Sequence, residues 1–534
     1  METHTKFNTK CVVVTCYYKL PHSKHTHQSY EVWMKNMLEN LLCPIVIFVG
    51  DRNTFENVSR MRVNFPSAMT EVIVLPLPNL RMEMYMNNWK YQWKNMDPEQ
   101  NIHNPSLYIL WNEKIEFMTK AKSVYSKKDL VSQPLWYMWM DIGSFRCRQS
   151  ELQSHEIREW LKDELLEQRL SKTKFNMLQV GNFEEHDRIL QPNGITVADF
   201  SRKLASVGGT FVIPAASIQL WNERYYLLLL KYLQNNRFAG KDQNVLSNML
   251  MLYPKDIHVL SAKKSEACVG DYDPWFYFHA FLHPKYPKPV WVSVLIPLYT
   301  KDIHFLKDSL KSVLSQSYPM YNCLVGVNGD KSQKEIVMKK INCIVKELTS
   351  NNNLELKVSI EWFDTKGKVD TMNAMVLSDT VQIPEGLDYN HRIAILDADD
   401  MWLAFKIGLQ VCAINIFNDK YDVIGGLCEY FDNAQGIPKI PAGDVTKHDF
   451  FAVNPIINSS VLIRKEDALW SDSFKGLDDY DMWMRLKYEK GRTFYNIGKI
   501  ITKHRVHNKS AFNASGVQDI NIFKRICRQK YNLL

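Results

Sequence analysis

Short apolar runs alternate with helical patterns along most of this chain, and the alternation limits the possible folds more than any other feature. After residue 290, strand patterns and helical patterns take turns in the order 292–299, 303–317, 323–327, 335–348, 356–363, 369–377 and 392–396. Strands separated by helices pair side by side in a mostly parallel sheet with helices on both faces. We therefore predict an α/β fold for this half.

The first half has the same rhythm. Its strand patterns lie at 11–18, 44–50, 72–77 and 135–140, and its helical patterns lie at 27–41 and 107–121. We find no aligned internal repeat between the halves. The sequence predicts two tandem α/β domains of similar, Rossmann-like class, each with a mostly parallel sheet.

A proline-rich segment separates the two patterns. Residues 283–289 contain Pro284, Pro287 and Pro289, and proline continues neither a helix nor a central strand. Such a segment is typical of a stiff linker. We predict a first domain over residues 1–283, a linker over 284–290 and a second domain over 291–534.

Composition excludes several classes of protein. The net charge is only +8 over 534 residues, and the lysines are scattered rather than gathered on one face as nucleic-acid binding needs. No apolar run approaches the roughly 20 residues of a transmembrane helix, and the first residues do not resemble a signal peptide. The ten cysteines form no Cys-x-x-Cys pair, which predicts free thiols in a reducing compartment and neither a zinc ribbon nor a disulfide framework. We expect a soluble, cytoplasmic protein.

An acidic cluster follows the last strand pattern of the second half. Asp397, Asp399 and Asp400 come directly after residues 392–396, and open α/β sheets bind ligands at the carboxyl ends of their strands. Carboxylates at contact distance repel unless a cation compensates them. Mg2+ and Mn2+ prefer carboxylates together with phosphate oxygens. The cluster predicts a divalent-metal site, Mn2+ or Mg2+, although the same residues could cap a helix that starts near Trp402.

The order of motifs over residues 290–513 resembles family 2 glycosyltransferases of the GT-A fold. The matching segments are 292–299, 316–319, 328–330, 396–400, 478–486 and 504–507. The resemblance implies a site for a nucleotide-diphosphate sugar donor, formed by Pro297, Tyr299, Asp330, Asp364, Lys368, Asn373 and Asp397. It also implies that Asp399 and His507 contact the metal.

The same resemblance implies the catalytic residues. Asp479 is the predicted base, with Asp478 beside it, and a carboxylate there would take the proton of the acceptor hydroxyl. A bound metal would neutralise the departing diphosphate, and an in-line displacement would invert the anomeric centre. Both aspartates could instead cap a helix, and His507 could be a polar surface residue. Two departures stand out: the sequence at 328–331 is Asn-Gly-Asp-Lys where many members have Asp-Asp-Gly-Ser, and the usual Glu-Asp pair is Asp-Asp here.

The first half resembles the HtrL/YibB protein family over residues 12–252. The matching segments are 15–18, 30–34, 44–48, 110–114, 139–146, 208–211 and 241–243. That family is grouped with GT-A-like glycosyltransferases, which implies a second transferase domain. We predict a donor site there formed by Thr15, Tyr17, Lys114, Asp141, Gly143 and Arg146.

The residues themselves support part of that assignment. Asp141 ends an apolar strand pattern, as Asp397 does in the other half. Gly143 allows a close approach of backbone or ligand, and Arg146 is suited to clamp a diphosphate. Asp242 precedes an apolar helical pattern and is either a catalytic base or an N-cap. His22, His25 and His27 do not have the spacing of a standard metal site.

Three hypotheses follow. In the first, the protein is a bifunctional glycosyltransferase that acts on a glycan or glycoconjugate acceptor. In the second, only the C-terminal half is catalytic and the N-terminal half binds the acceptor or serves as a scaffold. In the third, the chain is a non-catalytic carbohydrate-binding protein, for which acidic clusters at strand ends would have no purpose.

Overall fold

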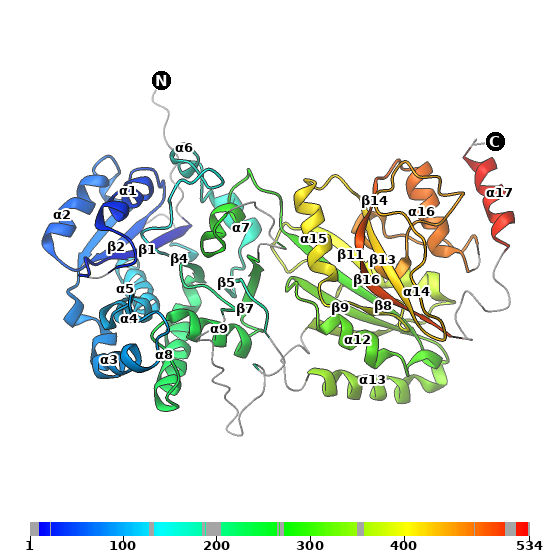
Figure 1. Ribbon diagram of the computed structural model, residues 1–534, viewed down its shortest axis with the longest axis horizontal. Helices are drawn as coiled ribbons and strands as arrows, with labels where there is room; N and C mark the ends of the chain where they lie inside the picture. The colour runs from blue at the N-terminus through cyan, green and yellow to red at the C-terminus, as the bar shows by residue number, and fades with distance from the viewer. Residues whose placement is uncertain are drawn as a thin grey trace. The chain divides into compact units, whose positions relative to one another are not determined.

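The computed structural model describes residues 10–21, 23–127, 133–183, 187, 204–263, 266, 272–349, 357–474, 476–507 and 519–531. The chain divides into two compact units (Figure 1). Unit 1 comprises Met1–Lys264, Val269–Tyr286 and Gly386–Asp388, and unit 2 comprises Ser265–Cys268, Pro287–Glu385 and Tyr389–Leu534. The main division therefore falls within the proline-rich segment 283–289.

Unit 1 is built on a mixed sheet of seven strands in the order β3-β2-β1-β4-β6-β5-β7. The strands are β1 (Cys11–Tyr17), β2 (Ile45–Val49), β3 (Thr70–Val74), β4 (Trp136–Met140), β5 (Phe175–Gln179), β6 (Thr210–Pro214) and β7 (Ile257–Ser261). Only β6 runs antiparallel to its neighbours β4 and β5. The parallel strands β1 to β4 bring their carboxyl ends to one edge.

Helices cover both faces of this sheet (Figure 1). They are α1 (His27–Leu38), α2 (Arg52–Met61), α3 (Met86–Asn95), α4 (Pro105–Asn112), α5 (Lys114–Tyr125), α6 (Ser154–Ile157), α7 (Asp163–Arg169), α8 (Ile218–Gln234), α9 (Asp242–Leu252) and α11 (Phe278–Phe281). An aromatic core that includes Trp89, Phe117 and Tyr225 packs α3, α5 and α8 against one face. The strongly apolar strand patterns are explained by this burial on two sides.

The single helix predicted over residues 107–121 is two helices. Glu113 is both the C-cap of α4 and the N-cap residue of α5. Its buried carboxylate accepts hydrogen bonds from the backbone N–H groups of Arg81 (3.0 Å) and Met82 (2.9 Å). The break thus serves a tertiary contact that helical periodicity does not reveal.

Unit 2 contains a mixed sheet of nine strands, with the order β10-β9-β8-β11-β15-β13-β16-β12 and β14 beside β16. The strands are β8 (Val290–Tyr299), β9 (Tyr321–Asn328), β10 (Val358–Trp362), β11 (Asn390–Ile395), β12 (Met401–Trp402), β13 (Val423–Asp432), β14 (Gly443–Asp444), β15 (Leu462–Arg464) and β16 (Phe494–Val506). The four strands β8 to β11 are parallel, and β15 is antiparallel to β11. The predicted α/β class is confirmed for both halves.

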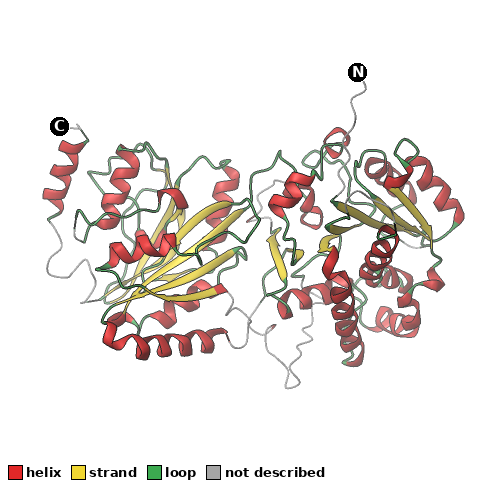
Figure 2. Ribbon diagram, turned by 180° about the vertical axis from the view of Figure 1, so that it is seen from behind, coloured by secondary structure: helices red, strands yellow, loops and turns green. Residues whose placement is uncertain are grey.

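Two layers of helices enclose the sheet of unit 2, as Figure 2 shows. The helices are α12 (Leu306–Leu314), α13 (Lys334–Thr349), α14 (Lys368–Leu377), α15 (Lys406–Ile416), α16 (Asp478–Tyr488) and α17 (Ile520–Lys530). Helices α14 and α16 share one apolar core, in which Met372, Met375 and the fully buried Trp483 pack on Leu295 of β8. This packing fixes the first turns of α14 and α16 relative to the sheet.

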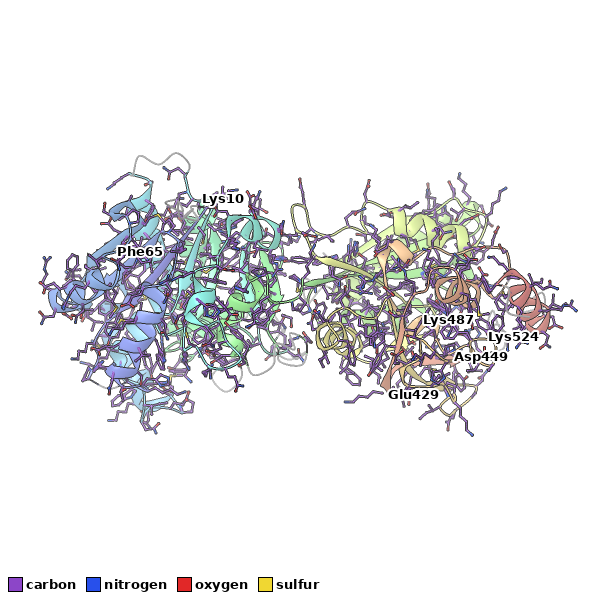
Figure 3. All side chains as sticks on the ribbon, turned by 90° about the horizontal axis from the view of Figure 1, so that it is seen from above. Lys10, Phe65, Glu429, Asp449, Lys487 and Lys524 are labelled. Atoms are coloured by element: carbon purple, nitrogen blue, oxygen red, sulfur yellow. The ribbon has the colours of Figure 1, made fainter. Side chains whose placement is uncertain are left out.

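A lysine of α16 secures the loop that precedes β15. Lys487 donates a hydrogen bond to the carbonyl of Thr446 (2.6 Å) and another to the carbonyl of His448. Burial lowers the pKa of Lys487, and the charge of Asp449 opposes this effect. Both residues are labelled in Figure 3. These contacts hold α16, which carries Asp478 and Asp479, against its own unit.

The prediction of a helix that starts near Trp402 is wrong. Met401 and Trp402 form β12, which pairs antiparallel with β16, and α15 begins only at Lys406. Asp399 and Asp400 therefore cap no helix here. The pairing partner of β12 lies about a hundred residues further along the chain, so a local reading could not identify it.

The expectation that every cysteine is a free thiol also needs correction. Eight cysteines within the described ranges are free, whereas Cys412 is disulfide-bonded. A disulfide depends on how close two residues lie in the fold, which sequence spacing does not show. Among the described helices, none is long and apolar enough to cross a membrane.

Candidate active sites in the two units

Asp397 and Lys368 meet at the carboxyl ends of the parallel strands of unit 2. Asp397 follows β11, and Lys368 is the first residue of α14. Lys368 Nζ lies 3.0 Å from Asp397 Oδ1. Burial disfavours the charge on Lys368, but the carboxylates of Asp397, Asp478 and Asp479 outweigh it and raise the pKa of the ammonium. Lys368 is thus a fixed cation among three carboxylates.

The second oxygen of Asp397 is held by a short 3-10 helix, Asn458–Ser460, that our sequence reasoning missed. Asp397 Oδ2 accepts hydrogen bonds from Asn458 Nδ2 (3.1 Å) and Ser459 Oγ (3.3 Å). Burial would raise the pKa of Asp397, but the charge of Lys368 and the bond from Asn458 prevail and lower it. Asp397 is therefore ionised and oriented, with Oδ1 toward Lys368 and Oδ2 toward Asn458 and Ser459.

Asp399 contacts His507, the other residue that we predicted to bind the metal. Asp399 Oδ2 lies 3.0 Å from His507 Nε2. Burial raises the pKa of Asp399, the charges of Asp400 and Asp397 add to this effect, and the bond to His507 opposes it. No set of three or more His, Cys, Asp or Glu side chains within the described residues is arranged to hold a metal. The pair could supply two ligand atoms to a Mg2+ or Mn2+ ion whose other ligands are water and phosphate oxygens.

Asp400 has a structural role beside this pair. It is 1% exposed and accepts hydrogen bonds from His504 Nδ1 (3.1 Å) and the backbone N–H of Arg505 (2.9 Å). Burial opposes the charge on His504, but Asp400, Asp397 and Asp399 outweigh it and raise the pKa of the imidazole to about 9. Arg505 Nε also donates to the carbonyl of Asp399 (2.8 Å). These contacts fix the end of β16 against the acidic triplet.

Asp478 and Asp479 occupy the first turn of α16. Burial and the neighbouring charge of Asp478 raise the pKa of Asp479 to about 6, with Lys368 opposing. Asp479 Oδ1 accepts a hydrogen bond from the backbone N–H of Tyr480 (2.8 Å). One oxygen of Asp478, Oδ2, is buried without a hydrogen-bond partner in the described part of the chain. The residue before the helix is Leu477, so neither aspartate is the N-cap.

The predicted nucleotide-binding residues lie at neighbouring strand ends. They differ in how exposed they are and in how many contacts they already make with the protein. Pro297 and Tyr299 end β8, and the ring of Tyr299 is 49% exposed. Asp364, after β10, accepts from Trp362 Nε1 (2.8 Å) and pairs with Lys331 (3.0 Å), the residue that departs from the family pattern. Asp330, after β9, is turned toward its own chain. It accepts hydrogen bonds from the backbone N–H (2.9 Å) and hydroxyl (2.7 Å) of Ser332.

Asn373 is committed to the protein rather than to open space. Its Nδ2 donates to the carbonyl of Trp470 (3.0 Å), and its Oδ1 accepts from the backbone N–H of Trp470 (2.9 Å). This double contact ties α14 to the segment before α16. The amide keeps one N–H group and one lone pair for a further partner.

In unit 1 the structure brings three predicted residues together. Lys114 Nζ lies 3.2 Å from Asp141 Oδ1, 2.9 Å from Asp242 Oδ2 and 2.7 Å from the carbonyl oxygen of Gly208. Burial opposes the charge of Lys114, but the two carboxylates prevail and raise its pKa. Burial and the charge of Asp141 raise the pKa of Asp242, with Lys114 opposing. Lys114 and Asp242 are buried, whereas the side chain of Asp141 is 37% exposed.

An aromatic group lies near the same strand ends. The guanidinium of Arg146 lies 4.7 Å from the centroid of the Trp33 ring and 5.3 Å from that of Phe276. A Cβ on Gly143 would come within 2.9 Å of the Trp33 ring, so glycine lets α1 approach this turn. Arg146 Nε donates to the carbonyl of Gly143 (3.2 Å). The aromatic contacts orient the guanidinium but leave its other N–H groups for a ligand.

Thr15 and Tyr17, both on β1, differ in their access to a ligand. Thr15 is fully buried, and its hydroxyl has no hydrogen-bond partner in the part of the chain that the structure describes. The hydroxyl of Tyr17 lies 3.1 Å from His27 Nδ1, and its ring is 5.7 Å from that of Tyr30. Tyr17 therefore borders the aromatic group, whereas Thr15 lies beneath it in the sheet.

Comparison with known proteins gives one curated relative. No family model matches the chain. The chain is 24% identical over 242 residues to WfgD of Escherichia coli, a UDP-Glc:alpha-D-GlcNAc-diphosphoundecaprenol beta-1,3-glucosyltransferase, and the match covers 45% of this chain and 83% of WfgD.

Solved structures similar to the chain include TarS and a mannosyltransferase. TarS 1-349 of S. aureus with UDP-GlcNAc has a TM-score of 0.33 at 13% identity and covers 44% of this chain and 66% of that one. The mannosyltransferase PcManGT of Pyrobaculum calidifontis, in complex with GDP-Man and Mn2+, has a TM-score of 0.30 at 12% identity and covers 47% of this chain and 71% of that one. The chain spans about three fifths of the TarS fragment in complex with UDP, where the overlap is 61%. The resemblance of the first half to the HtrL/YibB family stays a prediction.

Proposed function

We propose that this protein is a glycosyltransferase that uses nucleotide-diphosphate sugars and that unit 2 catalyses the transfer. The observation that carries the proposal is the position of Lys368, 3.0 Å from Asp397 and electrostatically coupled to Asp478 and Asp479. This cation joins the strand end predicted to bind the donor to the helix predicted to carry the base. The similarity to the curated glucosyltransferase WfgD supports the same class of reaction.

The donor would bind with its diphosphate beside the acidic triplet. Asp397 is ionised and held by Lys368 and Asn458, so it can accept hydrogen bonds from sugar or ribose hydroxyls. Asp399 and His507 would hold the divalent ion, which when bound neutralises charge on the departing diphosphate. The Mn2+ in the PcManGT complex supports this choice of ion.

Asp479 is the proposed catalytic base. Its pKa of about 6 leaves it ionised at neutral pH yet basic enough to accept a proton. As the acceptor oxygen bonds to the anomeric carbon, the O–H proton passes to Asp479, and the bond from that carbon to the diphosphate oxygen breaks. One displacement of this kind inverts the anomeric configuration. Lys368 would offset the repulsion between the carboxylates of Asp397, Asp478 and Asp479 during this step.

We propose further that unit 1 is a second transferase domain, which would make the protein bifunctional. The observation in its favour is that Asp141, Arg146 and Tyr17 lie at the carboxyl ends of parallel strands, the usual ligand-binding edge of such a sheet. The alternative, an acceptor-binding or scaffold domain, would use the same aromatic group for carbohydrate. A glycan or glycoconjugate would be the acceptor in either case.

A panel of UDP-glucose, UDP-GlcNAc and GDP-mannose, incubated with the full chain and Mn2+, tests the proposal. We expect at least one donor to be bound and slowly hydrolysed, with loss of hydrolysis in Asp479→Asn. If none of the three is bound or hydrolysed with or without metal, the enzymatic proposal fails. Asp141→Asn distinguishes the domains, because only a site in unit 1 should respond to it.

A further inference from the structure

The acidic clusters of the two units are neutralised in different ways. In unit 2 five carboxylates, those of residues 397, 399, 400, 478 and 479, surround Lys368 and the charged His504. Arg505 also contacts this cluster, but its guanidinium pairs with Asp308 (3.0 Å) and Asp432 (3.2 Å). Unit 2 therefore keeps an excess of negative charge, which a divalent cation would offset.

The cluster of unit 1 has its own cation at the centre. The three oxygens around Lys114 Nζ are two carboxylate oxygens, of Asp141 and Asp242, and the carbonyl oxygen of Gly208, at 3.2, 2.9 and 2.7 Å. Carboxylate and carbonyl oxygens are also the ligands that hard divalent cations prefer. An ammonium has three N–H groups; one donates to the carbonyl of Gly208, and the two carboxylates lie at ion-pair distance from the same nitrogen.

The surroundings fix this arrangement. The side chain of Lys114 is 6% exposed and that of Asp242 is 4% exposed. A Cβ on Gly208 would lie 2.0 Å from Asp242 Oδ2, so glycine allows the chain to pass directly over the ion pair. Because Lys114 and Asp242 are buried against each other, neither side chain is open to solvent. Asp141 and Arg146 are partly exposed.

We propose that Lys114 takes the place of a divalent cation in unit 1, so that this unit binds its ligand without metal. The proposal rests on the proposed role of unit 1 as a nucleotide-sugar site. Asp141 would bind hydroxyl groups of the ligand while Lys114 holds it in place, and Arg146 would contact the diphosphate. Lys114 is then a positioning residue, and Asp242 serves as its buried counter-ion rather than as a base.

The number of bound Mn2+ ions tests the metal part of the proposal independently of any sugar nucleotide. Electron paramagnetic resonance on the full chain should show that Asp399→Asn removes Mn2+ binding and that nothing remains for unit 1. If Asp399→Asn still binds one Mn2+ and the further change Asp141→Asn abolishes it, the proposal is overturned. The first step, the count of Mn2+ in Asp399→Asn, changes no residue of unit 1. A folding defect of unit 1 therefore does not affect that count.

A second variant removes Lys114 and so opens the position of its ammonium to a metal ion. In an Asp399→Asn background, Lys114→Ala leaves two carboxylates and a carbonyl around an empty position, and we expect it to gain one Mn2+ and a higher Tm in the presence of Mn2+. Failure of a soluble Lys114→Ala chain to gain Mn2+ would contradict the proposed equivalence. If this variant does not fold, the count in Asp399→Asn still decides.

Ligand binding forms the third arm. Calorimetry with UDP and with GDP, in EDTA and with Asp399→Asn as the protein, should show a remaining site that Arg146→Ala weakens at least about tenfold, the range expected for a charge-assisted contact. Binding that returns only when Mn2+ is added would overturn the inference. If neither nucleotide binds in either condition while the Mn2+ count is as expected, the transferase role of unit 1 fails but the metal-free character of the cluster stands.

Discussion

Lys368 Nζ lies 3.0 Å from Asp397 Oδ1, and the same ammonium is coupled to Asp478 and Asp479 on a different helix. One side chain thus sets the electrostatic balance of the whole candidate site in unit 2. Because it holds several carboxylates in one small region, its removal should affect chemistry far more than folding.

Lys368→Met should lower kcat/KM at least about a hundredfold, in line with the loss of a preorganised charge at a reacting centre. The lysine side chain is 43% exposed, so its ion pair should contribute less than about 1 kcal/mol to the free energy of unfolding. Steady-state kinetics and urea unfolding of the same sample measure both quantities. A large loss of stability with unchanged kcat/KM would show that Lys368 is only a structural residue.

Asp399→Ala should abolish metal-dependent binding of UDP or GDP to unit 2, because the diphosphate loses its bridge to the protein. Isothermal titration with and without Mn2+ measures this effect. Asp472→Ala, which changes an exposed aspartate of the same unit, is the matched control and should bind as the unaltered chain does. Metal-dependent binding that survives Asp399→Ala would rule out this residue as the ligand.

Asp479→Asn should leave donor binding intact and reduce transfer by about 100- to 10,000-fold, the usual contribution of a general base. Asparagine has nearly the same shape but takes no proton. Donor affinity by titration and turnover by product formation separate the two effects. Near-normal turnover would mean that another group accepts the proton.

The pH dependence of turnover should report the same carboxylate. The pKa of Asp479 is raised to about 6, and the base acts only when deprotonated. Activity should therefore be constant above this pH and should fall about tenfold per pH unit below it. A profile of kcat that is flat between pH 5 and pH 7 would exclude this residue as the base; both limits bracket the value of about 6.

Gly208→Ala should destabilise unit 1, because the added Cβ would lie 2.0 Å from Asp242 Oδ2 and force the buried ion pair apart. Overpacking of this kind costs about 1–3 kcal/mol. Urea unfolding compares it with Gly498→Ala, whose Cβ would meet Ala442 at an ordinary 3.7 Å. Equal stability of the two variants would show that the Lys114 cluster adapts freely.

The sequence was informative where the determinants are local. Strand patterns and the polar residues that follow them predicted the positions of Asp141 and Asp397, since a residue after a parallel strand must lie at the carboxyl edge of the sheet. The break at Glu113 and the strand at Met401–Trp402 could not be predicted, because each depends on a partner far along the chain. Asn458 and Ser459 were missed for the same reason: they precede β15, whose antiparallel place beside β11 carries no local signal.

The pairing of charges could be predicted only in part. Lys114 and Asp242 were both predicted site residues, and their mutual burial is the basis on which we propose other roles for them. The order of residues along a chain does not show which cation pairs with which carboxylate. Distances in the folded unit were needed for that distinction.

The contact between Asp399 and His507 joins positions 108 residues apart in the chain. During synthesis, a ribosome that has reached Asp400 has made β11 and the acidic residues that follow it but neither His504 nor His507, which come with and after β16. A nascent or prematurely released chain would therefore carry an acidic cluster without its histidine partners. Completion of β16 would act as a late checkpoint, so that only full translation of this strand yields a unit able to consume sugar nucleotides.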